Sequence, residues 1–166
     1  MSNVEKRLKA AGLSLPSRPA KPVGIYVPAV RSGNLLFVSG HGPLRTDGTL
    51  MRGRVGDDIS VEQAAEAARV TGLSMLATVK VALGSLDCVA RAVKVLGLVR
   101  AVPEFTQQPA VMDGFTEVLR IAFGEAGLPA RSAIGVASLP EEICVEVEAV
   151  FEVRAGRRVP KTGRKS

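Results

Sequence analysis

The sequence predicts an α+β domain in which one antiparallel or mixed sheet carries two long helices on one face. Three observations support this fold class. Residues 145–153 alternate apolar and mostly acidic side chains, which is the period of a strand with one buried face. Residues 60–84 carry a broad apolar face between an N-cap candidate, Ser60, and a C-cap candidate, Gly84. Further strand-like segments lie on both sides of this helix along the chain.

Each remaining element has its own local signal. Asn3 can cap a first helix that Gly12 ends, and a Pro-rich connector follows. The loop 31–34 contains a glycine and joins two strands as a hairpin, and Gly97 is interpreted as a bulge in a long β-branched strand. In chain order, the predicted elements are a helix at 3–12, strands at 25–30 and 35–39, a short strand near Leu50, the helix at 60–84, a strand at 89–100, a helix at 111–123 and strands at 132–138 and 145–153.

The last two strands are predicted to form a hairpin. The residues between them, Leu139-Pro140-Glu141-Glu142, indicate a turn because proline fixes φ and removes a donor. Arg131 stands at the start of the first strand, and the return strand carries glutamates, among them Glu146. An arginine within reach of a glutamate on the neighbouring strand can hold a small carboxylate and a water molecule together.

The composition limits the classes of protein to consider. A chain of 166 residues suits one domain, and 46% hydrophobic with only 4% aromatic residues predicts a core of Val, Leu, Ile and Ala. No apolar run is long enough to cross a bilayer, and residues 2–12 lack the apolar core of a signal peptide. Cys88 and Cys144 lie far apart, without metal-ligand spacing. We therefore expect buried free thiols, a cytoplasmic location, and neither metal nor cofactor.

The positive charge is concentrated at the C-terminus. The net charge is +6, and residues 154–166 carry six basic side chains and no acidic one. We predict a single domain at 1–154, of which 1–21 form an N-terminal helix and Pro-rich extension, and a basic tail at 155–166. The tail is interpreted either as a solvated, disordered end or as a contact for nucleic-acid phosphates. A sheet with helices on one face leaves the other face open, so we expect an oligomer of identical chains.

Four short patterns together resemble the RidA/YjgF family of reactive-intermediate deaminases, also called "endoribonuclease L-PSP" or chorismate-mutase-like proteins. The resemblance covers about residues 22–154 and is closest to the longer-chain branch of the family. The patterns are Tyr26-Val27 before the turn Gly33-Asn34, Ser39-Gly40 followed by Gly42-Pro43, Pro129-Ala130-Arg131-Ser132, and Leu139-Pro140 before Val145-Glu146-Val147-Glu148.

The resemblance implies a fold, an assembly and a reaction. The fold would be a sheet of six strands with two helices on one face, assembled as a homotrimer around a central β-barrel, with ligand pockets between subunits. The reaction would be the hydrolysis of 2-imino acids to 2-keto acids and ammonia. Arg131 would grip the substrate carboxylate, because a guanidinium binds a carboxylate bidentately, and Glu146 would orient the water or carry its proton. The substrate-binding positions implied are Tyr26, Ser39, Gly40, His41, Asp113 and Gly114.

Two of these positions depart from the family pattern, and the single residues keep alternative interpretations. Asp113 stands where the longer branch has asparagine, and its carboxylate would repel an acidic substrate; His41 stands where the compact branch often has glutamine. Arg131 is alternatively a salt-bridge partner on the surface. Glu146 is alternatively a strand residue that faces solvent. Tyr26, Ser39 and His41 are alternatively structural residues of a strand, a turn and a loop.

Three functions remain open on the sequence. The first is the deaminase, and the second is a protein that binds a small carboxylate without turnover. The third is a ribonuclease or RNA-binding protein, suggested by the family's older label and the basic tail. The glycines of residues 40–48 lack the following Lys-Ser/Thr of a phosphate-binding loop. With one histidine and no evident partner for it, the sequence supports RNA cleavage least.

Overall fold

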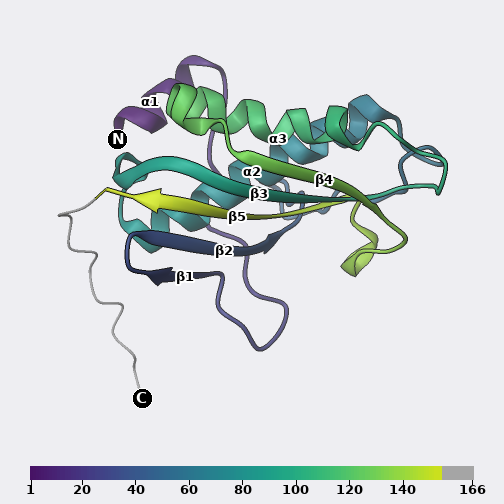
Figure 1. Cartoon of the computed structure of the whole chain (residues 1–166), viewed down its shortest axis with the longest axis horizontal. Coiled ribbons are helices and arrows are strands. Elements are labelled where there is room, and N and C mark those ends of the chain that lie inside the picture. The colour runs from purple at the N-terminus through teal and green to yellow at the C-terminus, as the bar shows by residue number, and fades with distance from the viewer. Residues whose placement is uncertain (155–166) are drawn as a thin grey trace.

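One mixed sheet organises the molecule, with the helices packed against one of its faces (Figure 1). The structure is a computed structural model that describes residues 1–154. Along the sheet the strands follow the order β1-β2-β5-β3-β4, and every neighbouring pair is antiparallel except β3 and β4, which are parallel. The strands are β1 (Ala29–Ser32), β2 (Leu35–His41), β3 (Val89–Arg100), β4 (Ala130–Val136) and β5 (Val145–Val153). The predicted α+β fold class is confirmed.

Three α-helices cover the sheet, and their ends follow from local side chains. The helix at 60–84 is confirmed: Ser60 and Gln63 form a reciprocal capping box, and Gly84 ends the helix at φ 76°. Ser2, not Asn3 as predicted, caps the first helix, since its hydroxyl accepts the Glu5 N–H. The α-helices are α1 (Asn3–Ala10), α2 (Val61–Leu83) and α3 (Gln108–Phe123), and the short 3₁₀ helices are η1 (Leu86–Cys88), η2 (Gly124–Gly127) and η3 (Pro140–Glu142).

The core lies between the sheet and the helices. The apolar residues of β5 that alternate with its glutamates are all buried there, as their period predicts. Val4 and Leu8 of α1 join the same core, and α2 and α3 pack closely side by side. The predicted bulge at Gly97 is wrong. Gly97 instead leaves room for the Met112 side chain, because a Cβ at residue 97 would lie 2.5 Å from Sδ of Met112. The irregular pairings of β3 fall nearer its start, between residues 89 and 94.

The predicted terminal hairpin is wrong, because β3 lies between β4 and β5 (Figure 1). Strand β4 runs parallel to β3, and the segment 137–144, with η3, carries the chain past β3 to its other side. The sequence does contain a turn at Pro140, but a turn does not determine which strands become neighbours. Arg131 and Glu146 are therefore two strands apart.

The first strands differ from their predicted limits. Residues 25–28 lie outside the sheet, while Arg31 and Ser32 belong to β1, because a turn of two residues, Gly33-Asn34, brings Ser32 opposite Leu35. The short strand near Leu50 is reduced to a single bridge with Leu44. The described sheet consequently has five strands rather than the six that the resemblance implies.

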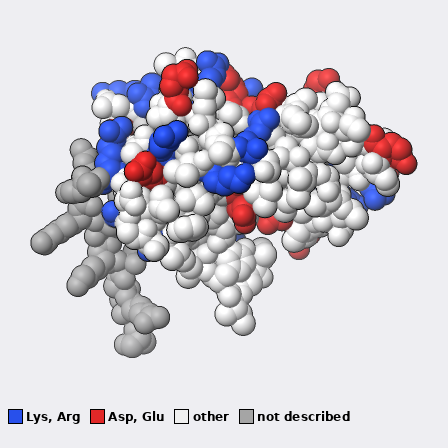
Figure 2. Space-filling model, viewed as in Figure 1, with Lys and Arg blue, Asp and Glu red and all other residues white. Residues whose placement is uncertain are grey.

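The sheet face opposite the helices is open and partly apolar. Val30, Phe37 and Ile134 are 53%, 46% and 47% exposed. Figure 2 views the molecule from this side and shows uncharged surface interrupted by separate basic and acidic groups.

Cys88 and Cys144 are free and buried, as predicted. None of the helices described within residues 1–154 is long and apolar enough to span a membrane. The predicted basic tail at 155–166 lies outside the described residues.

Candidate functional site

Glu146 lines a cavity of about 260 Å³ at the end of β2. Its neighbours Val145 and Val147 are buried toward the helices, so alternation places Glu146 on the open face of the sheet. Within residues 1–154 its carboxylate makes no hydrogen bond or ion pair. Burial raises the pKa of this carboxyl above its ordinary value, and the charge of Glu148 raises it further. A half-buried carboxylate without a partner can bind a water molecule and exchange a proton with it.

Gly40 makes room for this carboxylate. The pairing of β2 with β5 shifts by one residue between Val38 and His41, which is a β-bulge that contains Gly40. A Cβ at Gly40 would collide with Oε1 of Glu146 and would lie 2.9 Å from its Cδ. The Glu146 carboxylate therefore lies directly against the backbone of β2, and a side chain at residue 40 would displace it.

Tyr26 lies on the side of the cavity that the N-terminal segment contributes, and Ser39 of β2 attaches that segment. The Tyr26 ring lines the cavity, and its hydroxyl accepts a hydrogen bond from the Val23 N–H at 3.4 Å. The Ser39 hydroxyl donates to the Val27 carbonyl at 2.8 Å. Ser39 thus attaches residues 23–27 to β2, and in this chain its role is to hold Tyr26 over the cavity.

His41 lines the cavity, but both nitrogens of its ring are engaged within the chain, so its contact with a substrate stays a prediction. The imidazole is buried, its Nδ1 lies 2.7 Å from the Ser39 carbonyl, and its Nε2 lies 2.8 Å from the Thr78 hydroxyl of α2. Burial lowers the pKa of the ring, opposed by the hydrogen bond to Ser39, so the ring is neutral at pH 7. The bulge at Gly40 turns this side chain toward the helices, where it joins β2 to α2.

The turn predicted at Pro140 forms another wall of the cavity, and sequence reasoning missed its strain and its arginine partners. Glu141 and Glu142 both have positive φ, at 54° and 57°. Arg52 donates to the carbonyl of Glu141 at 2.7 Å and to its carboxylate at 3.3 Å. Arg100 donates in the same way to Glu142, at 3.3 and 3.4 Å. The only signal in the sequence was the pair of glutamates after Pro140, which gave no indication of their partners.

Arg131 lies on the other face of the sheet, away from this cavity. In β4 it stands beside Val95, which is buried toward the helices. Its Nη1 donates to Oδ1 of Asp113 at 2.9 Å and to the Thr116 hydroxyl at 2.8 Å, and its Nη2 donates to the Pro109 carbonyl at 3.2 Å. All three acceptors belong to α3, so this helix fixes the guanidinium at the open edge of the sheet.

Asp113 and Gly114 have different roles, although they are adjacent. Asp113 is the ion-pair partner of Arg131, and its side chain is 72% exposed. Gly114 is buried where α3 crosses α2, and a Cβ there would collide with the carbonyl of Ala65. Gly114 lets the two helices approach, and the expectation that it contacts a ligand stays a prediction. Thr116 was missed by the sequence analysis, although it lies three residues from Asp113, on the same face of α3.

The predicted site residues thus fall into two groups within one chain. Tyr26, Gly40, His41 and Glu146 line the cavity, and Ser39 attaches the segment that carries Tyr26. Arg131 and Asp113 lie at the β4 edge, on the helix-covered face. The first group can hold a water molecule and a proton, and the second can bind an anion. Within residues 1–154, no cluster of three His, Cys, Asp or Glu side chains is arranged to hold a metal ion.

Comparison with known proteins agrees with the fold. The family model described as "YjgF/chorismate_mutase-like, putative endoribonuclease" matches residues 5–150. "Protein TCP17" of Trypanosoma cruzi is 39% identical, over 90% of this chain and 94% of its own. "2-iminobutanoate/2-iminopropanoate deaminase" of Dermatophagoides farinae is 30% identical, over 85% of this chain and 94% of its own. The crystal structure of "a putative endoribonuclease" from Shewanella oneidensis has a TM-score of 0.87 at 30% identity, covering 92% of this chain and all of that one.

Proposed function

This chain belongs to the YjgF/chorismate mutase-like family, and on that premise we propose that it is an imine deaminase that hydrolyses 2-imino acids. The observation that carries the proposal is the unpaired, half-buried carboxylate of Glu146 facing a cavity. A relative named for the hydrolysis of 2-iminobutanoate and 2-iminopropanoate supports the choice of substrate. We expect the reaction to take place in the cytoplasm.

The chemistry requires a water molecule, a proton path and a carboxylate anchor. The imine carbon is electrophilic when its nitrogen is protonated, so position contributes more than a strong nucleophile. Glu146 accepts a proton from the attacking water as the oxygen bonds to the imine carbon, and returns it to the nitrogen. The C–N bond then breaks as Glu146 takes the proton of the new hydroxyl and its oxygen forms the carbonyl, which releases ammonia and leaves the 2-keto acid. Arg131 binds the substrate carboxylate and stays charged at any working pH.

The two groups must come from different copies of the chain. Arg131 and Glu146 lie on opposite faces of one sheet, with β3 between their strands, so they cannot contact the same small molecule within one copy. A second copy that packs on the open face brings its own β4 edge toward the Glu146 cavity. The exposed apolar residues Val30, Phe37 and Ile134 favour such packing. A head-to-tail contact of this kind closes into a ring, and we propose a homotrimer with three shared sites.

Mixing two inactive variants tests this arrangement. Arg131→Ala and Glu146→Gln are purified, each is assayed alone, and the two are then unfolded together and refolded at equal amounts. Separately, each variant is expected to lose the formation of keto acid from 2-iminobutanoate. The mixture is expected to recover roughly a quarter of the wild-type rate, because three quarters of random trimers are mixed and each mixed trimer has one intact site in three.

Two controls make the result decisive. A double variant, Arg131→Ala with Glu146→Gln in one chain, is refolded with wild type, and it measures any effect of dilution. Size-exclusion chromatography with light scattering gives the number of copies. Inactive single variants whose mixture stays inactive would contradict a shared site, and wild type that does not accelerate keto-acid formation would remove the enzyme itself.

A non-catalytic carboxylate-binding protein is the second candidate, favoured by the ion pair that Arg131 already makes with Asp113. Binding of 2-oxobutanoate that depends on Arg131, without any turnover, would identify it. RNA cleavage has less support from the described residues, because the imidazole of His41 is buried with both nitrogens partnered and is not available as a general base. The basic residues 155–166 remain the segment to delete in a test of RNA affinity.

A further inference from the structure

The hydrogen bonds of Arg131 leave one edge of its guanidinium free. A guanidinium has five N–H donors, and three of them are used within the chain, by Asp113, Thr116 and the Pro109 carbonyl. The two that remain are the Nε–H and one N–H of Nη2. Nε and Nη2 lie on the same edge of the guanidinium, and one N–H from each can match the two oxygens of one carboxylate. The Arg131 side chain is only 19% exposed, so it has little freedom to present any other edge.

Thr116 holds the guanidinium without using charge. Its hydroxyl accepts from Nη1 of Arg131 at 2.8 Å and donates to the Met112 carbonyl one turn earlier at 3.2 Å, so its orientation is fixed from both sides. The Pro109 carbonyl holds Nη2 in the same uncharged manner. Arg131 therefore keeps two neutral contacts when the charge of Asp113 is removed. Positioning alone does not account for a carboxylate at residue 113.

We propose that Asp113 selects the substrate class, by admitting imino acids with a single carboxylate and rejecting those with a second acidic group. The inference rests on the proposed function and deepens it. Asp113 neutralises Arg131 and is 72% exposed, so its own negative charge faces whatever binds at the free edge. One substrate carboxylate is held by two charge-assisted hydrogen bonds, which outweigh the repulsion from Asp113. A second carboxylate finds no further free donor on Arg131, meets Asp113 and is repelled.

The same charge favours substrates that carry a cationic group. A protonated imine nitrogen, or an ammonium group on the side chain, is attracted to Asp113 while the carboxylate occupies Arg131. The pair of opposite charges, 2.9 Å apart, is complementary to a zwitterion. The expected substrates are thus monocarboxylic imino acids with neutral or basic side chains.

A competition between two imino acids tests this inference. Wild type, Asp113→Asn and the control Glu117→Gln are assayed with 2-iminobutanoate, made by a dehydratase, and with the imino acid that an oxidase makes from glutamate. Glu117 is the next carboxylate along α3; it pairs with Arg120 and does not contact Arg131, so it controls for the change in net charge. Asp113→Asn is expected to raise kcat/KM for the dicarboxylic substrate, relative to the monocarboxylic one, roughly threefold to tenfold. Glu117→Gln is expected to leave the ratio unchanged.

The outcomes separate this inference from the function on which it rests. A ratio that does not change in Asp113→Asn, while both imino acids are hydrolysed, would overturn the selectivity and leave the deaminase standing. If wild type hydrolyses neither, the deaminase fails, and calorimetry with 2-oxobutanoate and 2-oxoglutarate then measures the same ratio as binding constants. Equal discrimination by wild type and Asp113→Asn in that measurement, or no binding of either keto acid, would overturn the inference as well.

Discussion

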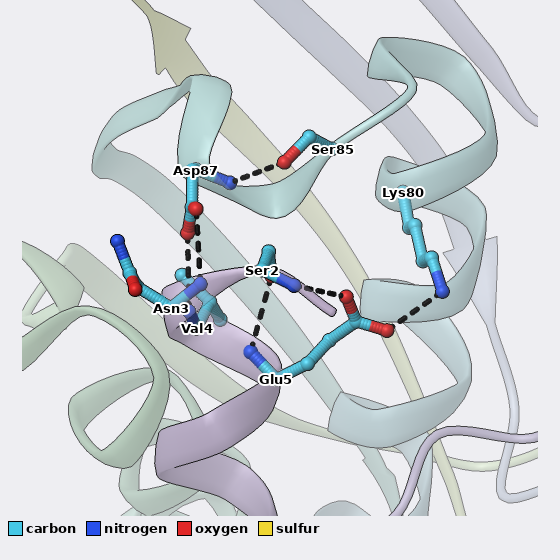
Figure 3. Close-up of polar contacts among 7 residues, drawn as sticks. All are labelled: Ser2, Asn3, Val4, Glu5, Lys80, Ser85 and Asp87. Carbon is cyan, nitrogen blue, oxygen red and sulfur yellow. Dashed lines mark hydrogen bonds and ion pairs between the residues drawn. The ribbon is translucent and has the colours of Figure 1, made fainter.

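Glu5 and Glu146 are both glutamates in partly buried positions, and the chain surrounds their carboxylates in opposite ways. Both oxygens of Glu5 are partnered: Oε2 accepts the Ser2 N–H at 2.9 Å, and Oε1 binds Nζ of Lys80 at 2.7 Å (Figure 3). These hydrogen bonds, that with Lys80 foremost, lower the pKa of Glu5 to about 2. Glu146 has no such partner within residues 1–154, and burial raises its pKa.

The surroundings of Glu5 attach α1 to the rest of the molecule. Figure 3 shows that Asp87 approaches the start of α1 from a neighbouring segment, and its two oxygens accept the N–H groups of Asn3 and Val4 at 2.9 and 3.1 Å. Two carboxylates thus satisfy the free N–H groups at this helix end, and Lys80 of α2 balances one of them. Glu5, Asp87 and Lys80 thus all have a structural use.

The surroundings of Glu146 keep its carboxylate available instead. Gly40 leaves space beside it. Arg52 and Arg100 bind the strained residues Glu141 and Glu142, and neither arginine binds Glu146. An unpaired carboxylate in a half-buried site costs folding free energy. The difference teaches that the partners of Glu5 use its charge to fix the fold, whereas the surroundings of Glu146 leave its carboxylate free for the proposed chemistry.

The largest expected effect is on activity at Glu146. Glu146→Gln keeps the size of the side chain and removes its ability to exchange a proton, so the rate of imine hydrolysis is expected to fall by about 10² or more. The measurement is kcat for keto-acid formation from 2-iminobutanoate, and KM is expected to change little. Glu148→Gln, two residues away on the same face, is the control. Equal losses of kcat in both variants would mean that Glu146 contributes only negative charge to the open face of the sheet.

The second expected effect is on stability at Glu5. Its pKa is lowered, so its contribution to the free energy of unfolding is present above pH 4.5, the ordinary value, and is lost as the pH falls toward 2. Because the Lys80 side chain is 44% exposed, water screens the pair, and Glu5→Gln is expected to cost about 1 kcal/mol at pH 7. Urea unfolding at pH 7 and pH 3 measures it. A cost that is the same at both values would contradict an electrostatic origin.

The smallest expected effect has the opposite sign and is the sharpest test of the comparison. The pKa of Glu146 is raised, so its protonated form is favoured on folding, and stability is lost as the pH rises from 4.5 through the folded-state pKa. Glu146→Gln is therefore expected to stabilise the protein at pH 7, by roughly 0.5 kcal/mol, and to lose this advantage below pH 4.5. Thermal unfolding across this range measures the difference. Destabilisation at pH 7 would show that Glu146 has a partner in the assembled protein.

The elements that the sequence predicted well depend on neighbours within a few residues. The capping box of Ser60 and Gln63, the end of α2 at Gly84 and the alternation of β5 are such signals, because a hydrogen bond within one turn or a period of two is written locally. The place of Gly40 at the cavity was implied by resemblance alone, and the structure adds the reason, which is the carboxylate of Glu146 against Gly40.

The tertiary structure decided the features that involve residues distant in the chain. Tertiary packing placed β3 between β4 and β5 and put Arg131 and Glu146 on opposite faces, and it brought His41 against α2 and Gly114 against Ala65. The partners of Arg131 lie 15 to 22 residues away and those of Arg52 lie 89 away, distances over which no local pattern extends. The sequence by itself determined which residues have the chemistry of a site. The pairing of strands decided that one copy carries these residues in two separate places. The reason is that the order of strands in a sheet depends on which of their faces are buried together.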